Sequence, residues 1–391
     1  MKRIGNILTG CFEHGYSVEE LKTTVIDTLS PFFSNAYALK QYWTDAELLS
    51  AFEYIIRYQC DEIFSSKIIE LIKFYQAVYV QYPNEMLDIV THSVCNLLQK
   101  ENIMWHKRNN EISFESDELD EIVVKAMAQI GSVLEIGVKP ILMELWAYVK
   151  LISNGRVDYK KIQELRFGTI IQNLLNAHYF EDILQTKPQM LKLSDWRNIA
   201  YHHSYRVLQS QEFLCTYGKD NSVVFNVDEL KSYTYQIIRA ANILSIARMF
   251  FIFDHLEAIK GYCTEHGNDY STAYISKSLQ KNSIAVSFLS QGYKLLSIHE
   301  DDEFCVTDIQ DLTDTSSMSK TEKMKRWIHV SQYQMIIWKL TQKEKITINY
   351  FSPDLINEFS CGITGDICRE VFEGTKNPSD IAAQMEIDIK I

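Results

Sequence analysis

Apolar residues recur three and four positions apart along much of the chain, which is the spacing of helices that face a core. Ile68, Leu71 and Tyr75 show this spacing and predict a helix over residues 65–80. Neighbouring stretches have the same stripe and carry capping boxes, in which Ser or Thr precedes Glu by three residues. We therefore expect an N-terminal helical domain over residues 1–125.

The segment 126–262 predicts four main helices. Pro140 marks the start or a kink of the first, and Gly155 ends it. A second helix follows from Asp158, a short third one comes after a connection, and a long last one opens near Val227. Four amphipathic segments with short connections are typical of a helical bundle.

The segment 263–391 has shorter and more strand-like patterns, so we expect a small α/β C-terminal domain there. Its strands predict a β-meander or the wing of a winged helix. The whole chain is thus expected to be mainly α-helical. The predicted C-terminal elements are alternating stretches at 284–288, 293–298 and 304–307, a helix at 323–340 and a strand at 345–350.

The most informative stretch is Leu193 to Arg206. Ser194 predicts a helix N-cap, which places Arg197 in the first turn. Asn198 and His202 are four residues apart and share a helical face.

On this interpretation the same helix continues past His202. Tyr205 and Arg206 extend its polar face, and His203 falls on its opposite, apolar side. The apolar stripe comprises Trp196, Ile199, Ala200, His203 and Val207.

Such a polar face suits phosphate chemistry. A helix N-terminus favours an anion, an arginine offers paired donors to a phosphate, and a histidine moves protons near neutral pH. The alternative interpretation is an ordinary helix start with a polar flank and a hydrogen-bonded histidine.

Arg197-Asn198-x-x-x-His202 resembles the R-x(4–6)-H motif of HEPN domains, which are helical bundles found in many toxin and anti-phage ribonucleases. The amphipathic segments before and after the motif resemble the helices that flank it in that family. The resemblance extends over about residues 133–260 and implies a HEPN-like bundle.

The resemblance also implies roles. Arg197 would stabilise the phosphorane, His202 would act as general base or acid, and Asn198 would orient the histidine or the phosphate. His203 with Tyr205 fits the longer form of the motif, whose tyrosine is modified by a nucleotidyltransferase in some members. The apolar position of His203 on the expected helix favours His202.

By resemblance, the chain is expected to be a metal-independent endoribonuclease without cofactors, active as a homodimer through this bundle. It would be the toxic effector of a bacterial abortive-infection or toxin–antitoxin system, with RNA as substrate and an antitoxin or sensor protein as partner.

Composition narrows these expectations. A net charge of -12 argues against a broad nucleic-acid surface, although it leaves room for local RNA contacts. The eight cysteines form no C-x-x-C pair, which favours reduced thiols and no metal site. Residues before Cys11 contain no signal-like apolar run, and 237–259 carries too many charges for a membrane span. We therefore expect a cytoplasmic protein with no membrane contact.

Two rival functions remain open. The bundle is alternatively a non-catalytic dimerisation or partner-binding module, or the chain is a regulator that binds DNA through a C-terminal winged helix. The cluster Lys320, Lys323, Lys325 and Arg326 is either a local nucleic-acid contact or a solvated helix face.

Overall fold

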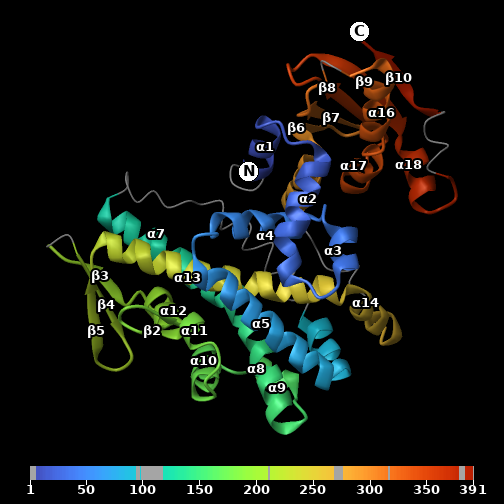
Figure 1. Ribbon diagram of the computed structural model, residues 1–391. Helices are drawn as coiled ribbons and strands as arrows, with labels where there is room; N and C mark the ends of the chain where they lie inside the picture. Colours follow the sequence, from blue (N-terminus) through green and yellow to red (C-terminus); the bar gives the residue numbers. More distant parts are fainter. Residues whose placement is uncertain are drawn as a thin grey trace. The chain divides into compact units, whose positions relative to one another are not determined.

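The chain is mainly helical and carries a small five-stranded sheet in its C-terminal part (Figure 1). This confirms the expected class, a mainly α protein with a C-terminal α/β region. The computed structural model describes residues 6–93, 97, 118–209, 212–267, 276–315, 318–377 and 384–390.

The residues group into two compact units. Unit 1 contains Met1–Pro31, Leu39–Ile56 and Ser276–Ile391, and unit 2 contains Phe32–Ala38 and Arg57–Ile275. This grouping departs from three consecutive domains with boundaries at residues 125 and 262. The first two helices belong with the C-terminal part because they pack on the helix that precedes its sheet. Periodicity identifies an apolar face but not the distant segment that covers it.

Unit 2 is built around α13 (Val227–Asp254), which contacts α5 (Glu62–Gln81) and α7 (Leu119–Ser132). The expected helix at 65–80 is thus confirmed within α5. By length and hydropathy α13 resembles a membrane span, but 56% of its most apolar window is buried, as in a core helix.

The next helices of unit 2 follow α7 with only a short connection between α8 and α9. The π-helical turn η2 (Val133–Val138) joins α7 to α8 (Lys139–Asn154), which ends at Gly155 in a left-handed conformation. The expected single helix from Asp158 is two helices, α9 (Tyr159–Gln163) and α10 (Phe167–Asn176). The other elements are residues 83–93 (helical), α11 (Glu181–Leu184), β1 (Gln185–Thr186), β2 (Leu191–Lys192), α12 (Leu193–Tyr201), β3 (Tyr205–Val207), β4 (Phe213–Tyr217), β5 (Asn221–Phe225) and α14 (Leu256–Glu265).

Unit 1 contains the five-stranded sheet, in the order β10-β9-β8-β7-β6. Only β7 and β8 pair in parallel, and the helices α16 and α17 cross between them. This is a mixed sheet, not the meander or two-stranded wing that we expected. The elements of unit 1 are α1 (Asn6–Glu13), α2 (Val18–Leu29), most of α3 (Ala36–Tyr42) and α4 (Ala46–Arg57), α15 (Lys277–Ser290), β6 (Tyr293–Glu300), β7 (Phe304–Asp311), α16 (Lys320–Ser331), α17 (Gln334–Thr341), β8 (Lys345–Phe351), β9 (Asn357–Thr364), α18 (Gly365–Phe372) and β10 (Glu386–Ile389).

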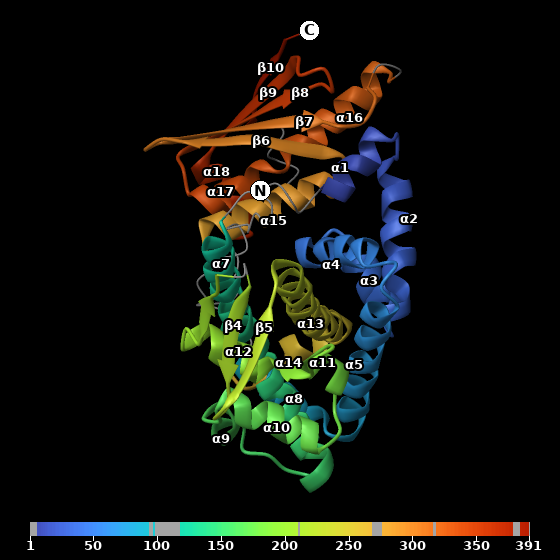
Figure 2. The ribbon, with the colours of Figure 1, turned by 90° about the vertical axis from the view of Figure 1, so that its left-hand side faces the viewer.

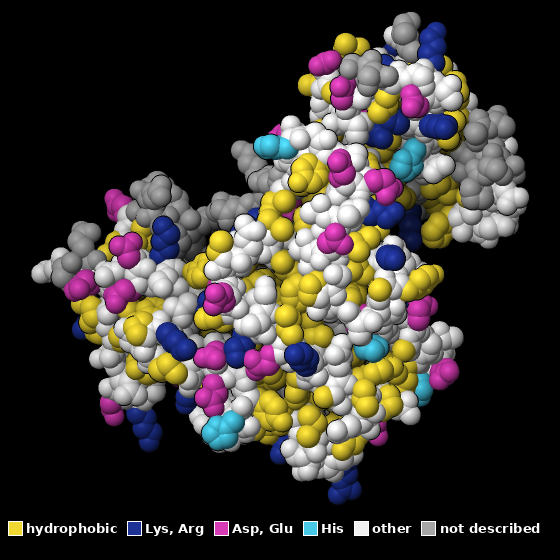
Figure 3. All heavy atoms as spheres, viewed as in Figure 1, with side chains coloured by type: hydrophobic (Ala, Val, Ile, Leu, Met, Phe, Trp, Pro, Cys, Tyr) yellow, Lys and Arg dark blue, Asp and Glu magenta, His cyan; other side chains and the backbone are white. Residues whose placement is uncertain are grey.

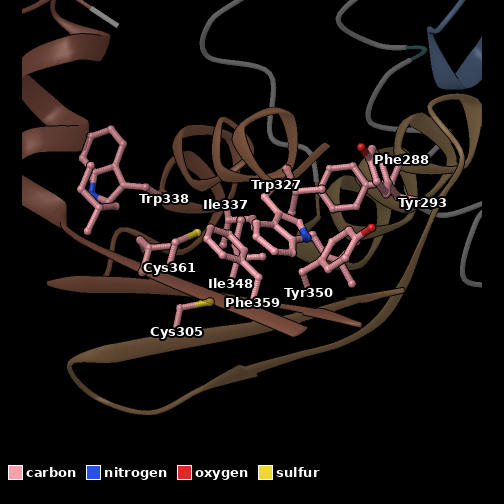
Figure 4. Packing of buried hydrophobic residues seen from close by; sticks show 14 of the residues in the cluster. Phe288, Tyr293, Cys305, Trp327, Ile337, Trp338, Ile348, Tyr350, Phe359 and Cys361 are labelled. Carbon is pink, nitrogen blue, oxygen red and sulfur yellow. The ribbon is translucent and has the colours of Figure 1, made fainter. Parts of the chain in front are cut away.

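The core of unit 1 lies between the sheet and its helices (Figure 4). Trp327 of α16 stacks on Phe359 of β9, with 5.3 Å between ring centroids. Every second residue of β7 faces this core, including Cys305 and Ile309. The expected strand at 284–288 lies instead in α15, where Phe288 is buried in the same core, so the short apolar alternation there was misleading.

Candidate functional site

The motif helix α12 is anchored in unit 2 by its apolar side. Trp196 and Ile199 are completely buried, and the Trp196 indole N–H donates to the Thr186 hydroxyl at 2.8 Å. The helix contacts α7, η2, α10 and β4, and Figure 2 shows it beside α7 and β4. The expected buried position of Trp196, Ile199 and Ala200 is confirmed.

The start of α12 differs from expectation. Lys192, not Ser194, is the N-cap residue, and its backbone N–H donates to the Asp195 carboxylate at 3.1 Å. Ser194 is buried within the first turn. Arg197 therefore lies in the second turn, and the argument for an anion at the helix N-terminus does not apply to it.

The end of α12 also differs. The helix stops at Tyr201, and His202 is its C-cap, with its backbone N–H donating to the Asn198 carbonyl at 3.0 Å. The Ser204 N–H then donates to the Ile199 carbonyl at 3.0 Å, and His203 adopts a φ of 50° between them. This is the Schellman pattern that closes many helices.

The early stop overturns the expected positions of the residues after it. His203 is exposed instead of buried on the apolar stripe, and Val207 is 41% exposed. Tyr205 and Arg206 lie in β3, so they do not extend the helical face of Asn198 and His202. The backbone leaves the helix because residues 205–207 pair with β4.

Arg197 is held on one side and open on the other. Its Nε donates to Glu135 Oε2 at 2.9 Å, and its Nη1 donates to Asn198 Oδ1 at 3.3 Å. The guanidinium also lies 4.6 Å from the centre of the Tyr201 ring. Nη2 makes no hydrogen bond to any residue that the structure describes, so this donor is left for a further partner.

Glu135 and Lys139 complete this cluster from η2 and the start of α8. Lys139 Nζ lies 2.6 Å from Glu135 Oε1, so one carboxylate bridges two cations. Partial burial raises the pKa of Glu135, but the hydrogen bonds from Lys139 and Arg197 outweigh it and hold this pKa below its ordinary value. The carboxylate is therefore ionised near neutral pH.

A close helix contact brings these residues together. A Cβ added to Gly131 of α7 would lie 3.2 Å from the Cβ of Ala200 and 3.3 Å from the Tyr201 ring. Glycine thus lets α7 and α12 approach closely, and about one turn after Gly131 and one turn before Ala200, Glu135 meets Arg197. The π-helical turn at this point shifts the register of the side chains that follow it, and such turns are frequent at functional sites.

The two histidines have different surroundings. Both are exposed, and His203 Nδ1 lies 3.4 Å from the Tyr205 hydroxyl. His202 makes no side-chain hydrogen bond to the part of the chain that the structure describes. The structure therefore brings Arg197 and Asn198 together with Glu135, Lys139 and Tyr201, which the sequence did not indicate, whereas His202 is exposed at the end of α12 and makes no side-chain hydrogen bond to this cluster within the described residues.

The basic cluster of α16 is not a continuous cationic surface. Arg326 is turned inward, where it pairs with the buried Asp311, and Lys323 lies 3.4 Å from Glu358. Over the face shown in Figure 3, basic and acidic side chains are interspersed. Lys320 and Lys325 are exposed, so only two of the four basic side chains of the cluster lie fully open on the surface of α16.

Within the described residues, no group of three or more His, Cys, Asp or Glu side chains is placed to hold a metal ion. Cys11, Cys60, Cys215, Cys263, Cys305, Cys361 and Cys368 are free thiols. Cys95 lies outside the described residues, and so does the polar stretch 107–117, whose composition predicts a connection between domains.

Searches of family models, curated proteins and solved structures find no match to this chain. The geometry of the site must therefore carry any functional argument. The sequence does indicate a pair between Glu135 and Lys139, which are four residues apart and precede Pro140. It does not indicate their partner, because Arg197 is 62 residues away from Glu135 in sequence.

Proposed function

We propose that the chain is a metal-independent endoribonuclease of the HEPN type. The observation that carries the proposal is the arrangement of Arg197, whose Nε donates to Glu135 and whose Nη1 donates to the exposed Asn198, while Nη2 makes no hydrogen bond to the described residues. An arginine oriented in this way presents a free donor to a phosphate oxygen.

The chemistry needs one proton acceptor and one proton donor. The 2′-oxygen of the substrate attacks the adjacent phosphorus, and the P–O5′ bond breaks. The proton of the 2′-hydroxyl goes to a neutral histidine, and the leaving 5′-oxygen takes a proton from a histidinium. The products are a 2′,3′-cyclic phosphate and a 5′-hydroxyl, and Arg197 neutralises the phosphorane between them.

One copy of the site supplies His202 for only one of the two proton transfers. We therefore place the active site at a homodimer interface, where the second copy provides the other histidine and closes the open surface of α12. His203, Tyr205 and Arg206 then line the approach to this interface, with His203 as the alternative proton carrier.

The biological role that fits this activity is a toxic effector in bacterial abortive infection or a toxin–antitoxin pair. Such an enzyme works on cytoplasmic RNA and is restrained by an antitoxin or a sensor protein. The acidic net charge is consistent with a local grip on RNA by Arg197 and Lys139 instead of a broad basic surface.

The test is cleavage of single-stranded RNA by the purified full chain in the presence of EDTA. Cleavage should leave 2′,3′-cyclic phosphate ends and fail on a substrate with a 2′-deoxy nucleotide at the scissile position. His202→Ala should lose about 10²–10⁴-fold in rate, which is the usual contribution of general acid–base catalysis. Unchanged cleavage by Arg197→Ala and His202→Ala would reject the proposal.

A second candidate is a non-catalytic module that binds a partner protein. It is favoured by the ion pair with Glu135 that already occupies part of Arg197 and by the exposure of Asn198 and His202. A folded, dimeric protein without RNA cleavage at any pH would select this alternative. A DNA-binding regulator is less well supported, because the expected wing is part of a mixed sheet and Arg326 pairs with the buried Asp311.

A further inference from the structure

Unit 2 contains a cavity that shares no residue with the Arg197 cluster. It lies between α8, α9 and α10 and has a volume of about 590 Å³. Ligand sites for small molecules commonly measure about 300–1,000 Å³. The cavity is therefore large enough for a nucleotide-sized ligand.

The lining is apolar at its base. Trp146 of α8 and Ile162 of α9 are 8% and 5% exposed, and Val157, Leu165 and Ala177 continue this lining. A flat or apolar group that binds there is removed from contact with water, and no charged group has to be buried with it. This favours a ligand with an aromatic body over a simple inorganic anion.

Three cationic side chains and one carboxylate line the cavity around this apolar surface. Lys150 lies over the Trp146 ring at 4.7 Å from its centre, Arg156 follows the end of α8, and Lys161 belongs to α9. Asp158 is the only acidic residue of the lining, and it lies 3.6 Å from the exposed Lys161. In a chain with a net charge of -12, this local excess of positive charge points to an anionic ligand.

Arg156 is the most available of these cations. It is exposed, and within the described part of the chain it makes neither an ion pair nor a side-chain hydrogen bond. Its planar fork matches two oxygens of a phosphate. Lys150, in contrast, is partly engaged with the indole face.

Side-chain amides complete the lining. Asn154 comes from the end of α8, and Asn173 and Asn176 come from α10. Asn176 accepts a hydrogen bond from Gln172 at 2.7 Å, which fixes the orientation of its amide group. An amide offers a donor and an acceptor side by side, which is the pattern that pairs with the edge of a nucleobase.

We propose that this cavity binds a nucleotide unit, with its base over the Trp146–Ile162 floor and its phosphate between Arg156, Lys150 and Lys161. The base edge then meets Asn173 and Asn176. The same chemistry occurs in a free nucleotide and in a nucleotide of an RNA strand. The proposal does not rest on the ribonuclease activity proposed for Arg197 and His202.

The test is equilibrium dialysis of the full-length chain against labelled AMP, ATP, inorganic phosphate and a short single-stranded RNA. Arg156→Gln should weaken binding about tenfold or more, because it removes a charge-assisted contact. Lys160→Gln is the matched control, since Lys160 is an exposed lysine of α9, close to Arg156 in sequence but outside the cavity lining. This control should change affinity less than twofold.

The pattern of binding identifies the source of the nucleotide. Arg156-dependent binding of AMP or ATP assigns a free nucleotide, and Arg156-dependent binding of RNA alone assigns an RNA strand. Asn173→Leu should weaken nucleotide binding while leaving inorganic phosphate unaffected. The proposal is overturned if no nucleotide or RNA binds at millimolar concentration, if phosphate binds as tightly as nucleotides, or if Arg156→Gln has no effect.

The result is separable from the ribonuclease proposal. His202→Ala should retain nucleotide binding, because His202 does not line the cavity. An inactive chain that still binds nucleotides through Arg156 would leave this inference intact.

Discussion

The buried ion pair of unit 2 offers a stability prediction whose size follows from the structure. Arg248 of α13 donates to Glu144 of α8 through Nε at 2.8 Å and through Nη2 at 3.0 Å, and Ser93 hydrogen-bonds to the same carboxylate. The Glu144 side chain is completely buried. Burial tends to lower the pKa of Arg248, but Glu144 more than offsets this and raises it, so the arginine stays charged.

Replacing Arg248 by Met removes the partner of a buried carboxylate and keeps much of the side-chain volume. Breaking a buried pair in this way costs about 3–5 kcal/mol, because one charge remains without compensation. For units of this size, each kcal/mol lowers Tm by about 2–4 °C, so we expect a loss of roughly 6–20 °C. The double variant Glu144→Met with Arg248→Met should recover most of this loss.

The assay must resolve unit 2 from unit 1, since a chain with two units need not unfold in one step. Hydrogen exchange of α8 and α13 peptides, followed by mass spectrometry across a urea series, reports on unit 2 directly. Lys260→Met is the control, because its ion pair with Glu257 is exposed and should contribute less than about 1 kcal/mol. A double variant as unstable as Arg248→Met alone would refute the reasoning.

Four further predictions concern the motif region. His203→Gly should stabilise the chain by about 0.5–1 kcal/mol because glycine tolerates the left-handed conformation at the end of α12, whereas His203→Ala should not; thermal unfolding of both variants checks this. Glu135→Ala should reduce kcat for RNA cleavage with little change in KM, and Glu135→Gln should retain more activity because it keeps an acceptor for Arg197 Nε. The pKa of Glu135 in the folded chain is lowered, so the ionised Glu135 carboxylate stabilises the fold above its unfolded-state pKa of 4.5, and this contribution is lost as the pH falls through the folded-state pKa. The difference in unfolding free energy between the native chain and Glu135→Gln should therefore shrink on acidification. Sedimentation should show a homodimer through the region 130–260 at micromolar concentration, and active monomer would contradict the shared-site proposal.

Local signals in the sequence were sufficient for much of the secondary structure. The capping box at Ser17 begins α2, Ser319 begins α16, and Gly155 ends α8 in the left-handed conformation. Each of these depends on residues within one turn of the boundary. The strand expected at residues 345–350 is also present, as β8.

Features that depend on contacts with residues distant in sequence could not be predicted from local sequence patterns. The helices of the first 56 residues are amphipathic, but nothing local indicates that α1 and α2 pack on α15. The end of α12 is another case, since no Gly or Pro marks it. There the pairing of β3 with β4 outweighs the cost of a left-handed histidine, and the local pattern suggested a longer helix.

The choice between His202 and His203 shows how this matters for function. The sequence favours His202 on the premise of a helix that places His203 in the core, and this premise is wrong because the helix ends at Tyr201. A different argument now supports the same residue. The His202 backbone N–H bonds to the carbonyl of Asn198, so His202 stays one turn from the residue whose side-chain amide contacts Arg197. His203 is turned away by its positive φ and lies within 3.4 Å of the Tyr205 hydroxyl, which ties its imidazole to β3. If cleavage nevertheless depends on His203 and survives His202→Ala, then the Arg197–Asn198 contact is not part of the reacting geometry, and the longer motif that includes Tyr205 is the functional one.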